Sequence, residues 1–482
     1  KKMVRNRVVI KYLGYILLFN ALFLFIAALI SLYQRESSLN ALLFSATMCA
    51  ALGTFPYLFI EKVEELRFHE GLAISVLGWL LTCIVGMMPY YIWGGEFTLA
   101  NAFFESVSGF TTTGASILTD VEALPMGLLF WRSATSFIGG VGIILFVLLV
   151  LPEKKGVQSS FYRAEVSDLS KMSFRTRSRH IVRIIAIVYF TLIITETILL
   201  KLLGMSFFDA VCHSFSTIAT SGFSTRNQSI AAFNNVRIEM IITIFMLLSS
   251  MHFGLVYATM TGKKHNIFTS RPSRMYMILV AGGILLIALQ LFNEAQYSLG
   301  DSFRYAAFQV VSLTSTTGLA TADTSLWPLF SIVLLIYFSF QCGMVGSTAG
   351  GIKFDRIYLF FHSVSKQLKL ILHPNGIYAV RMDKRTIEHE LELQVMVFII
   401  LYIFTFFVTA LLLTLMGVDG VTAFSASFAT LGNVGPGYGD VSSFGNYAAM
   451  PDAAKYLLSA NMLLGRLEIM NIFALFMMAG RK

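Results

Sequence analysis

Four short loops, each carrying a glycine, recur along this chain between long apolar segments. Their glycines are Gly114, Gly222, Gly318 and Gly435, which are separated by 108, 96 and 117 residues. A repeat of this length is a whole structural module rather than the short unit of a solenoid. The chain is therefore predicted to fold as four related modules.

The residues before each glycine repeat in the same register. The twelfth residue before the glycine is always alanine, and the sixth is always small. These positions are Ala102, Ala210, Ala306 and Ala423, and Ser108, Ser216, Ser312 and Ala429. Each preceding run makes a helix of about three turns, which is too short to cross a bilayer. A short helix that ends in irregular backbone within a membrane is tolerated only where it lines a water-filled path.

Four such loops around one axis can form an ion filter. Glycine adopts positive φ at little cost, so the carbonyl groups beside it can point inward. A ring of carbonyl oxygens can replace the hydration shell of a dehydrated cation. The alternative, ordinary extracellular turns, is disfavoured by the shared register. The predicted filter residues are Thr111, Thr112, Thr113, Gly114, Thr220, Ser221, Gly222, Thr316, Thr317, Gly318, Asn433, Val434 and Gly435.

The composition points to a membrane protein. Of the 482 residues, 56% are hydrophobic and 13% are charged, and the mean hydropathy is +0.72. These values exclude a soluble globular protein. The basic residues 1–7 lead directly into a long apolar segment, so no cleavable signal peptide is expected. Metal-ligand spacings and the HExxH and GxSxG motifs are missing from the sequence, which disfavours an enzyme.

The predicted fold is an all-α polytopic membrane protein with ten transmembrane helices and four re-entrant pore helices around one pore. Residues 8–33 and 39–60 form a helix pair outside the repeat, and each module runs helix, pore helix, filter loop and helix. The predicted units are 1–70 for the helix pair, 71–180 for module one with a cytoplasmic loop, 181–273 for module two, 274–390 for module three with a gating loop, and 391–482 for module four.

Lysine and arginine counts in the loops predict the orientation. Residues 152–183 carry eight basic residues, 262–274 carry four and 353–385 carry seven. Basic loops face the cytoplasm, so both termini are expected inside, with the filters opening outward. The basic face attracts anionic lipid, and docking of an acidic cytosolic partner is an equally open interpretation.

Acidic residues follow the filter loops or lie near them, namely Asp120, Glu122, Asp323 and Asp440. An acidic outer mouth would concentrate cations by electrostatic focusing. The alternative is that these are ordinary solvated loop residues, and the sequence leaves both interpretations open.

A glycine-rich run interrupts the apolar second helix of module three. Each glycine costs about 1 kcal/mol relative to alanine in a helix interior, and the freed backbone groups need water or partners. We predict a flexible gate that crosses the pore below the filter. A phosphate-binding loop lacks the required residue order, and a small-residue packing seam is the other alternative. The predicted gate residues are Gly343, Gly346, Ser347, Thr348, Ala349, Gly350, Gly351 and Lys353.

Arg466 and Glu468 interrupt the last apolar helix. They are two residues apart and project from different faces, so they cannot simply neutralise each other. Charges within a span indicate function by default. Arg466 can donate to the bare carbonyls of the broken module three and is therefore predicted to belong to the gate. Snorkelling of both side chains to the nearby membrane surface is the alternative.

Taken together, these motifs resemble the Trk/Ktr/HKT superfamily of potassium transporters over essentially the whole chain, and most closely its TrkH branch. The extra N-terminal helix pair fits that branch better than the shorter Ktr subunits. The motifs are Thr111-Thr112-Thr113-Gly114, Ala219-Thr220-Ser221-Gly222-Phe223, Ser315-Thr316-Thr317-Gly318, Asn433-Val434-Gly435-Pro436-Gly437, Gly346-Ser347-Thr348-Ala349-Gly350-Gly351 and Gly465-Arg466-Leu467-Glu468.

The resemblance implies K⁺ as the transported ion, because sodium-carrying relatives have serine at the place of Gly114. It further implies a homodimer in the bacterial cytoplasmic membrane, each protomer with its own pore. A cytosolic ring of nucleotide-binding (TrkA-like) regulatory subunits is the implied partner, beside membrane lipids. No cofactor and no nucleic acid are expected. An H⁺- or Na⁺-coupled K⁺ symporter and a membrane scaffold without ion flux are the alternatives.

Overall fold

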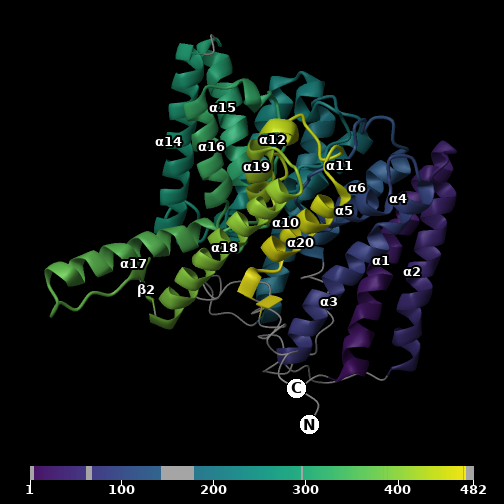
Figure 1. Cartoon of the computed structure of the whole chain (residues 1–482), viewed down its shortest axis with the longest axis horizontal. Coiled ribbons are helices and arrows are strands. Elements are labelled where there is room, and N and C mark those ends of the chain that lie inside the picture. Colours follow the sequence, from purple (N-terminus) through teal and green to yellow (C-terminus); the bar gives the residue numbers. More distant parts are fainter. Residues whose placement is uncertain are drawn as a thin grey trace.

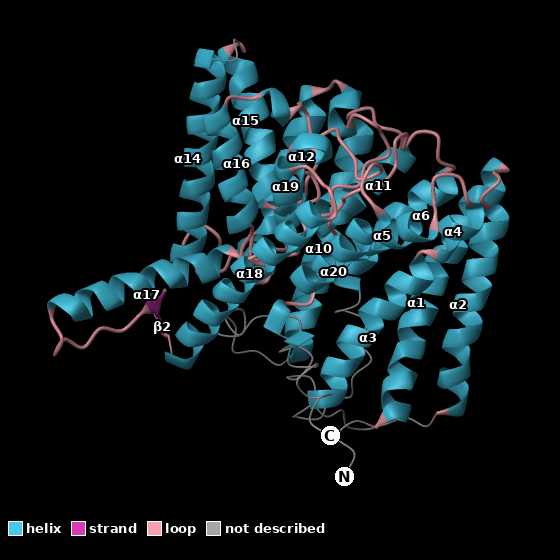
Figure 2. Cartoon of the chain, in the orientation of Figure 1, coloured by secondary structure: helices cyan, strands magenta, loops and turns pink. Residues whose placement is uncertain are grey.

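The computed structural model describes residues 5–60, 68–142, 178–294, 297–383, 385–387, 389–470 and 472–473. In these ranges the chain is mostly helical (Figure 2). The strands of the described part form one short antiparallel hairpin, β1 (Arg381–Met382) with β2 (Arg385–Thr386). The predicted all-α membrane character is therefore confirmed.

The N-terminal pair consists of α1 (Asn6–Gln34) and α2 (Leu39–Phe59), which lie side by side at one edge of the bundle (Figure 1). Their ends agree with the predicted helices 8–33 and 39–60 within two residues. The helices approach closely where glycine faces glycine. A Cβ on Gly14 would lie 2.9 Å from the Gly53 carbonyl oxygen, and one on Gly53 would lie 2.8 Å from that of Gly14.

Four units follow, each with a helix, a short helix, a loop and a further helix. The first contains α3 (Phe68–Gly86), α4 (Met88–Trp93), α5 (Leu99–Phe110), α6 (Met126–Phe137) and the π-helix η1 (Ile138–Gly142). The second contains α10 (Ser178–Leu202), α11 (Phe207–Ala219), η2 (Ser229–Phe233), α12 (Val236–Ser250) and α13 (Phe253–Met260). The third contains α14 (Arg271–Glu294), α15 (Leu299–Thr314), η3 (Thr324–Leu326), α16 (Leu329–Gln341) and α17 (Phe354–Leu372). The fourth contains α18 (His389–Leu415), α19 (Gly420–Leu431), η4 (Gly439–Val441) and α20 (Asp452–Arg466).

Six helices among the described residues are long and apolar enough to cross a membrane, or seven if the bent pair α12 and α13 counts as one span. Ten spans were predicted, and in the second, third and fourth units the last helix is short or broken. The bend between α12 and α13 is 114°, α16 has 13 residues, and Glu468 beyond α20 has φ of +62°. The sequence analysis predicted such a break in module three alone.

The four short helices α5, α11, α15 and α19 each begin with a polar cap. The side chains of Thr98, Ser206, Ser298 and Asp419 accept hydrogen bonds from backbone amides of the first turn. Such caps satisfy amides that have no partner within the helix. The caps at Thr98, Ser206 and Asp419 stand sixteen residues before their filter glycines, whereas α15 begins one turn earlier.

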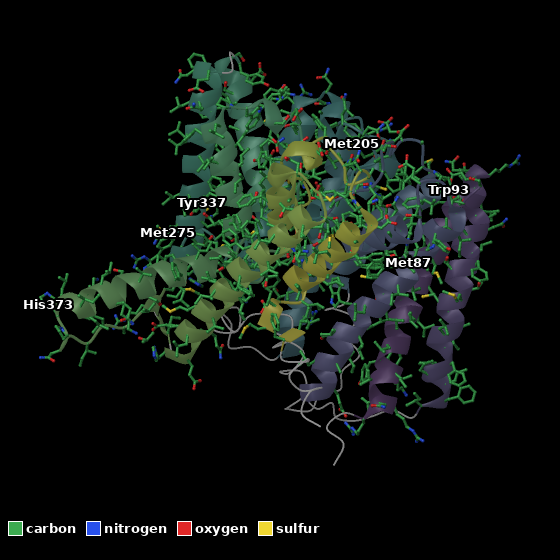
Figure 3. The ribbon with its side chains drawn as sticks, in the orientation of Figure 1. Met87, Trp93, Met205, Met275, Tyr337 and His373 are labelled. Carbon is green, nitrogen blue, oxygen red and sulfur yellow. The ribbon has the colours of Figure 1, made fainter. Side chains whose placement is uncertain are left out.

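The outer faces of the bundle are apolar. Tyr337 on α16 and Met275 on α14 are 39% and 40% exposed, as Figure 3 illustrates. Helix α17 leaves the bundle sideways, and His373 marks its far end (Figures 1 and 3). The predicted basic loop lies largely outside the described residues, and this includes Lys154, Lys155, Arg163, Lys171, Arg175 and Arg177.

Candidate ion filter and gate

The four predicted filter loops share one backbone conformation. The residue two before each glycine is left-handed, with φ of +53° at Thr112, +56° at Thr220, +60° at Thr316 and +53° at Asn433. The glycines themselves have φ of +76°, +90°, +75° and +93° in chain order. Few side chains tolerate this region. In all four loops the filter glycine takes this conformation beside the backbone of a neighbouring loop. A side chain would be strained and crowded there, so glycine is required.

One backbone hydrogen bond also recurs in all four loops. The amide of the residue before the glycine donates to the carbonyl of the residue six before the glycine. The pairs are Thr113 to Ser108 at 2.9 Å, Ser221 to Ser216 at 2.9 Å, Thr317 to Ser312 at 2.9 Å and Val434 to Ala429 at 2.8 Å. All four acceptor residues are completely buried. The small residue that repeats in the sequence therefore lies where the loop folds back onto its helix.

The loops close into a ring. A Cβ placed on each filter glycine would overlap a carbonyl oxygen of the next unit. The overlaps run from Gly114 to Ser221, from Gly222 to Thr317, from Gly318 to Val434 and from Gly435 back to Thr113. Each glycine thus allows a close approach between neighbouring loops. The structure brings all thirteen predicted filter residues together around one axis.

Two buried side-chain oxygen atoms of the filter loops lack a hydrogen-bond donor. In the part of the chain that the structure describes, Thr112 Oγ1 and Asn433 Oδ1 are buried and make no hydrogen bond. The Asn433 amide nitrogen donates to Thr113 Oγ1 at 3.0 Å and so ties the fourth loop to the first. Buried acceptors without donors are unfavourable unless something else satisfies them. A dehydrated cation would do so.

A polar side chain nine residues before the glycine braces three of the loops from behind. Glu105 accepts from the Ile117 amide at 3.0 Å, and His213 Nε2 lies 3.0 Å from Ser224 Oγ. Gln309 donates to the Ala322 carbonyl at 3.2 Å. The fourth unit has Ala426 at this position. The sequence analysis missed these braces, although alignment on the glycines would have revealed the shared register.

The brace of the first loop is also an ion pair. Arg132 on α6 donates to Glu105 at 2.5 Å and to the Ser224 carbonyl at 2.9 Å. Its guanidinium carbon lies 3.7 Å from the centre of the Phe223 ring. Both charges are buried. Breaking such a pair would leave an unpaired buried charge, which is strongly destabilising. Arg132 therefore links the first filter loop to the second.

The structure favours the second of the two interpretations left open for the acidic residues near the filter loops. The cavity outside the filter is lined by all four filter glycines and by Arg132 and Arg226. None of the four predicted acids lines it, although the structure describes them all. Asp120 and Glu122 instead accept from Asn227, and the bond from the Asn227 side chain lowers the pKa of Asp120. Asp323 and Asp440 lie in the short helical turns at η3 and η4. Asp120 and Glu122 are therefore bonded to a loop of the second module, and all four acids fit the alternative of ordinary loop residues.

The predicted gate loop lies directly beneath the filter. The Gly350 amide donates to Thr316 Oγ1 at 2.8 Å. Thr348 Oγ1 donates to the Ile218 carbonyl at 2.9 Å and lies 3.2 Å from that of Ser249. The loop is anchored at its start by the Met344 amide, which donates to the Ser250 carbonyl at 2.8 Å. The gate loop therefore contacts the second and third filter units from the inner side.

Arg466 reaches inward to this loop. It donates to the Thr348 carbonyl at 2.8 Å, to Gly139 at 2.7 Å and to Gly140 at 2.9 Å. The sequence analysis predicted the bond to module three but not the two bonds to module one. This geometry contradicts snorkelling of Arg466 to the membrane surface. Lys353 donates to the Ala349 carbonyl within the loop.

Glu468 serves a different partner, because it lies beyond the end of α20 with φ of +62° and not on another face of that helix. It accepts from Arg356 on α17 at 2.7 Å. The guanidinium carbon of Arg356 also lies 4.0 Å from the centre of the Phe398 ring. A second cavity opens on this side, and its lining includes Gly140, Gly350, Lys353, Arg466 and Glu468. The filter and the gate loop thus separate two cavities.

The site contains neutral oxygens rather than a cluster of metal ligands. Among the described residues no group of three or more His, Cys, Asp or Glu side chains could hold a metal ion. The four cysteines are buried free thiols. Alternating carbonyl and hydroxyl oxygens suit a large monovalent cation, which loses its hydration shell more easily than a divalent one.

Comparison with known proteins is consistent across sequence and structure. The family model of the cation transport protein TrkH matches residues 38–480. The chain is 34% identical to the Trk system potassium uptake protein TrkH of Escherichia coli over 98% of both chains. It is 32% identical to TrkG of the same species over 98% of this chain and 97% of the relative. The crystal structure of TrkH from Vibrio parahaemolyticus superposes with a TM-score of 0.87 at 31% identity, covering 98% of each chain.

Proposed function

The chain belongs to the TrkH family of cation transport proteins, and from this premise we propose that it takes up K⁺ across a membrane through the ring of four filter loops. The relatives are named potassium uptake proteins. The chain is a transporter and not an enzyme. The observation that carries the proposal is the closed ring of four glycines, each packed against a carbonyl of the next unit.

In this proposal the filter residues hold the dehydrated ion. Carbonyl groups beside Gly114, Gly222, Gly318 and Gly435 supply the outer oxygens. Thr112 Oγ1 and Asn433 Oδ1, which lack donors among the described residues, supply oxygens at the inner end. K⁺ is the transported ion, and no further cofactor takes part.

The gate is the loop from Gly343 to Lys353, with Arg466 as its latch. Three hydrogen bonds from Arg466 connect the loop to the backbone of module one. While they hold, the loop blocks the path between the two cavities. Opening requires the latch to release Thr348, so conduction is controlled from the inner side.

The membrane arrangement follows the same scheme. We propose ten spans, of which the last in modules two, three and four is short or broken, four re-entrant pore helices, and modules at 71–180, 181–273, 274–390 and 391–482 after the pair at 1–70. Both termini and the basic loops face the cytoplasm, and the filters open outward. The support is the distribution of lysine and arginine. The membrane is the bacterial cytoplasmic membrane.

The proposed assembly is a homodimer with a cytosolic ring of nucleotide-binding, TrkA-like subunits. Its support is the naming of the relatives as parts of a Trk system and the basic loops of this chain. The same loops attract anionic lipid. No nucleic acid is a partner in this scheme.

Flux through the purified protein in liposomes tests the proposal. We expect Rb⁺ uptake driven by a K⁺ gradient, with a reversal potential that follows that gradient alone. Liposomes without protein are the control. A reversal potential that shifts with an added pH or Na⁺ gradient would favour the coupled symporter instead. No flux from a folded, dimeric protein would favour the scaffold and overturn the proposal.

A further inference from the structure

One carboxyl group in a membrane span has no counter-charge among the residues that the structure describes. Glu196 lies on α10, within the apolar segment Val182–Leu202, and is completely buried. In the part of the chain that the structure describes, neither of its carboxyl oxygens makes a hydrogen bond. The filter and the gate described above do not use this side chain.

Other buried glutamates of the described chain are paired. Glu105 has Arg132 at 2.5 Å, Glu239 has Arg304 at 2.6 Å, and Glu392 has Lys366 at 3.1 Å. An isolated carboxylate is very unfavourable in an apolar interior, so the group is neutralised unless it finds a partner. Glu196 therefore fits this fold in its protonated form.

The Thr217 hydroxyl is the polar neighbour of Glu196. Thr217 lies in the last turn of the pore helix α11, and its hydroxyl is also buried without a hydrogen bond among the described residues. A protonated carboxyl is a donor, and a hydroxyl can accept from it. A small side-chain rotation would let the two groups form a hydrogen bond, in which either the protonated carboxyl donates to the hydroxyl or the hydroxyl donates to the ionised carboxyl.

The cations Arg183 and Lys201 on α10 and Arg237 on α12 are exposed. The Thr217 hydroxyl lies beside the Glu196 carboxyl. Six further titratable groups on α10 and on the elements packed against it have partners elsewhere. On α11 to α13 and on α10, these groups bond or pack with other residues: Asp209 with Arg226, His213 with Ser224, Glu239 with Arg304, His252 with the Gly254 amide, Tyr257 with Lys263 and Tyr189 with the Phe137 carbonyl.

Glu196 lies next to the C-terminal end of α11, where the chain contacts both the second filter loop and the gate loop. The Thr217 carbonyl accepts from the amide of Thr220 at 3.1 Å, where the second filter loop begins. The next carbonyl, that of Ile218, accepts from Thr348 Oγ1 of the gate loop at 2.9 Å. The Thr348 carbonyl is in turn held by Arg466. A change at Thr217 therefore reaches both elements through adjacent residues.

We propose that Glu196 is a proton-binding site that favours the closed gate when occupied. With its proton, the carboxyl can donate to Thr217, and α10 and the end of α11 stay packed together without water between them. Loss of the proton to water leaves a charge that must be hydrated, which requires α10 and α11 to separate and loosens the contact with Thr348. Because the closed state binds the proton more tightly, raising the pH favours the open state.

This inference rests on the proposed K⁺ flux, and two measurements separate the two claims. The first is infrared difference spectroscopy of the purified protein during a pH change from about 5 to about 9, a range that brackets ordinary and raised carboxyl titration. We expect a band of a protonated carboxylic acid that disappears at high pH and is missing in Glu196→Gln. This result does not depend on flux. If the band is unchanged in Glu196→Gln, Glu196 is not the protonated group and the inference fails.

The second measurement is Rb⁺ flux over the same pH range. Wild-type flux should rise with pH, whereas Glu196→Gln, which cannot ionise, should be low at every pH. Thr217→Val removes the hydroxyl that can donate to the ionised carboxyl but leaves the acid, so its flux should rise at higher pH than in the wild type. Thr195→Val, an exposed position one residue away, is the matched control and should follow the wild type. A Glu196→Gln profile that matches the wild-type profile would overturn the coupling to the gate.

Discussion

The filter and the gate loop lie next to each other but are held in different ways. Each filter loop is stabilised by a backbone hydrogen bond within its own module, repeated four times at 2.8–2.9 Å. The gate loop exists once, and side chains of other modules hold it, above all Arg466. A structure held by repeated backbone contacts should lose selectivity when the backbone is disturbed. A structure held by side-chain donors should loosen when a single side chain is removed.

The largest effect is expected from filter glycines. In Gly114→Ser, or in alanine variants of Gly222, Gly318 or Gly435, the new Cβ overlaps a carbonyl of the next module. The left-handed conformation at these positions also costs about 1–2 kcal/mol for any residue that carries a Cβ. The K⁺ over Na⁺ preference should fall about tenfold or more. Reversal potentials in mixed gradients measure this preference.

Gly282→Ala is the control for these variants. A Cβ at Gly282 on α14 would meet no atom within 4 Å, so selectivity should be unchanged. Wild-type permeability ratios in all four filter variants would refute the ring of equivalent loops.

The next effect is expected at the latch. Arg466→Ala removes three hydrogen bonds from a charged donor, each contributing about 1.5–3 kcal/mol. Basal Rb⁺ flux should rise about tenfold to a hundredfold without a change in selectivity. Deleting residues 346–350 should act similarly, and the two changes should be non-additive because both release the same latch.

Lys455→Ala provides the comparison for Arg466→Ala. Lys455 is a buried cation on the same helix, but it donates to Asn101 and Ala448, away from the gate. Its loss should lower the melting temperature without raising basal flux. If Arg466→Ala yields a folded protein with wild-type or lower flux, the proposal that Arg466 holds the gate loop closed is wrong.

A smaller effect is expected at Glu468. Glu468→Gln weakens the pair with Arg356, which ties the helix after the gate to the end of α20. A partly exposed ion pair contributes about 1 kcal/mol, so basal flux should rise about fivefold. Glu390→Gln, at an exposed position at the start of α18, should leave flux unchanged. Equal flux in these two variants would show that Glu468 does not contribute to gating.

The smallest effect is expected at Thr348. Thr348→Val removes the hydroxyl bonds to Ile218 and Ser249 but keeps the carbonyl that Arg466 holds. One neutral hydrogen bond contributes as little as about 0.5 kcal/mol, so basal flux should rise about twofold. Ser347→Ala removes only a bond within the loop, to the Met344 carbonyl, and serves as the control. A larger rise in basal flux in Ser347→Ala than in Thr348→Val would show that the gate loop is held by hydrogen bonds within the loop.

The sequence alone determined the repeated features. The register of the filter loops and the small residue six before each glycine could be predicted because each depends on neighbours within one module. The glycine-rich break in module three was visible for the same reason. The N-terminal helices α1 and α2 are long and apolar, and their ends were predicted within two residues.

Tertiary structure decided the contacts between modules. The bonds of Arg466 to Gly139 and Gly140 join residues more than 300 positions apart, and no local pattern indicates such a pairing. The breaks in the other modules, the Glu105–Arg132 pair and the neighbours of Asp120 also depend on which helices pack together. Burial of Glu196 was equally hidden, since a single glutamate in an apolar helix does not reveal which face meets α11. Local conformation is encoded by adjacent residues, whereas the partner of a buried charge is set only when the modules close around the pore.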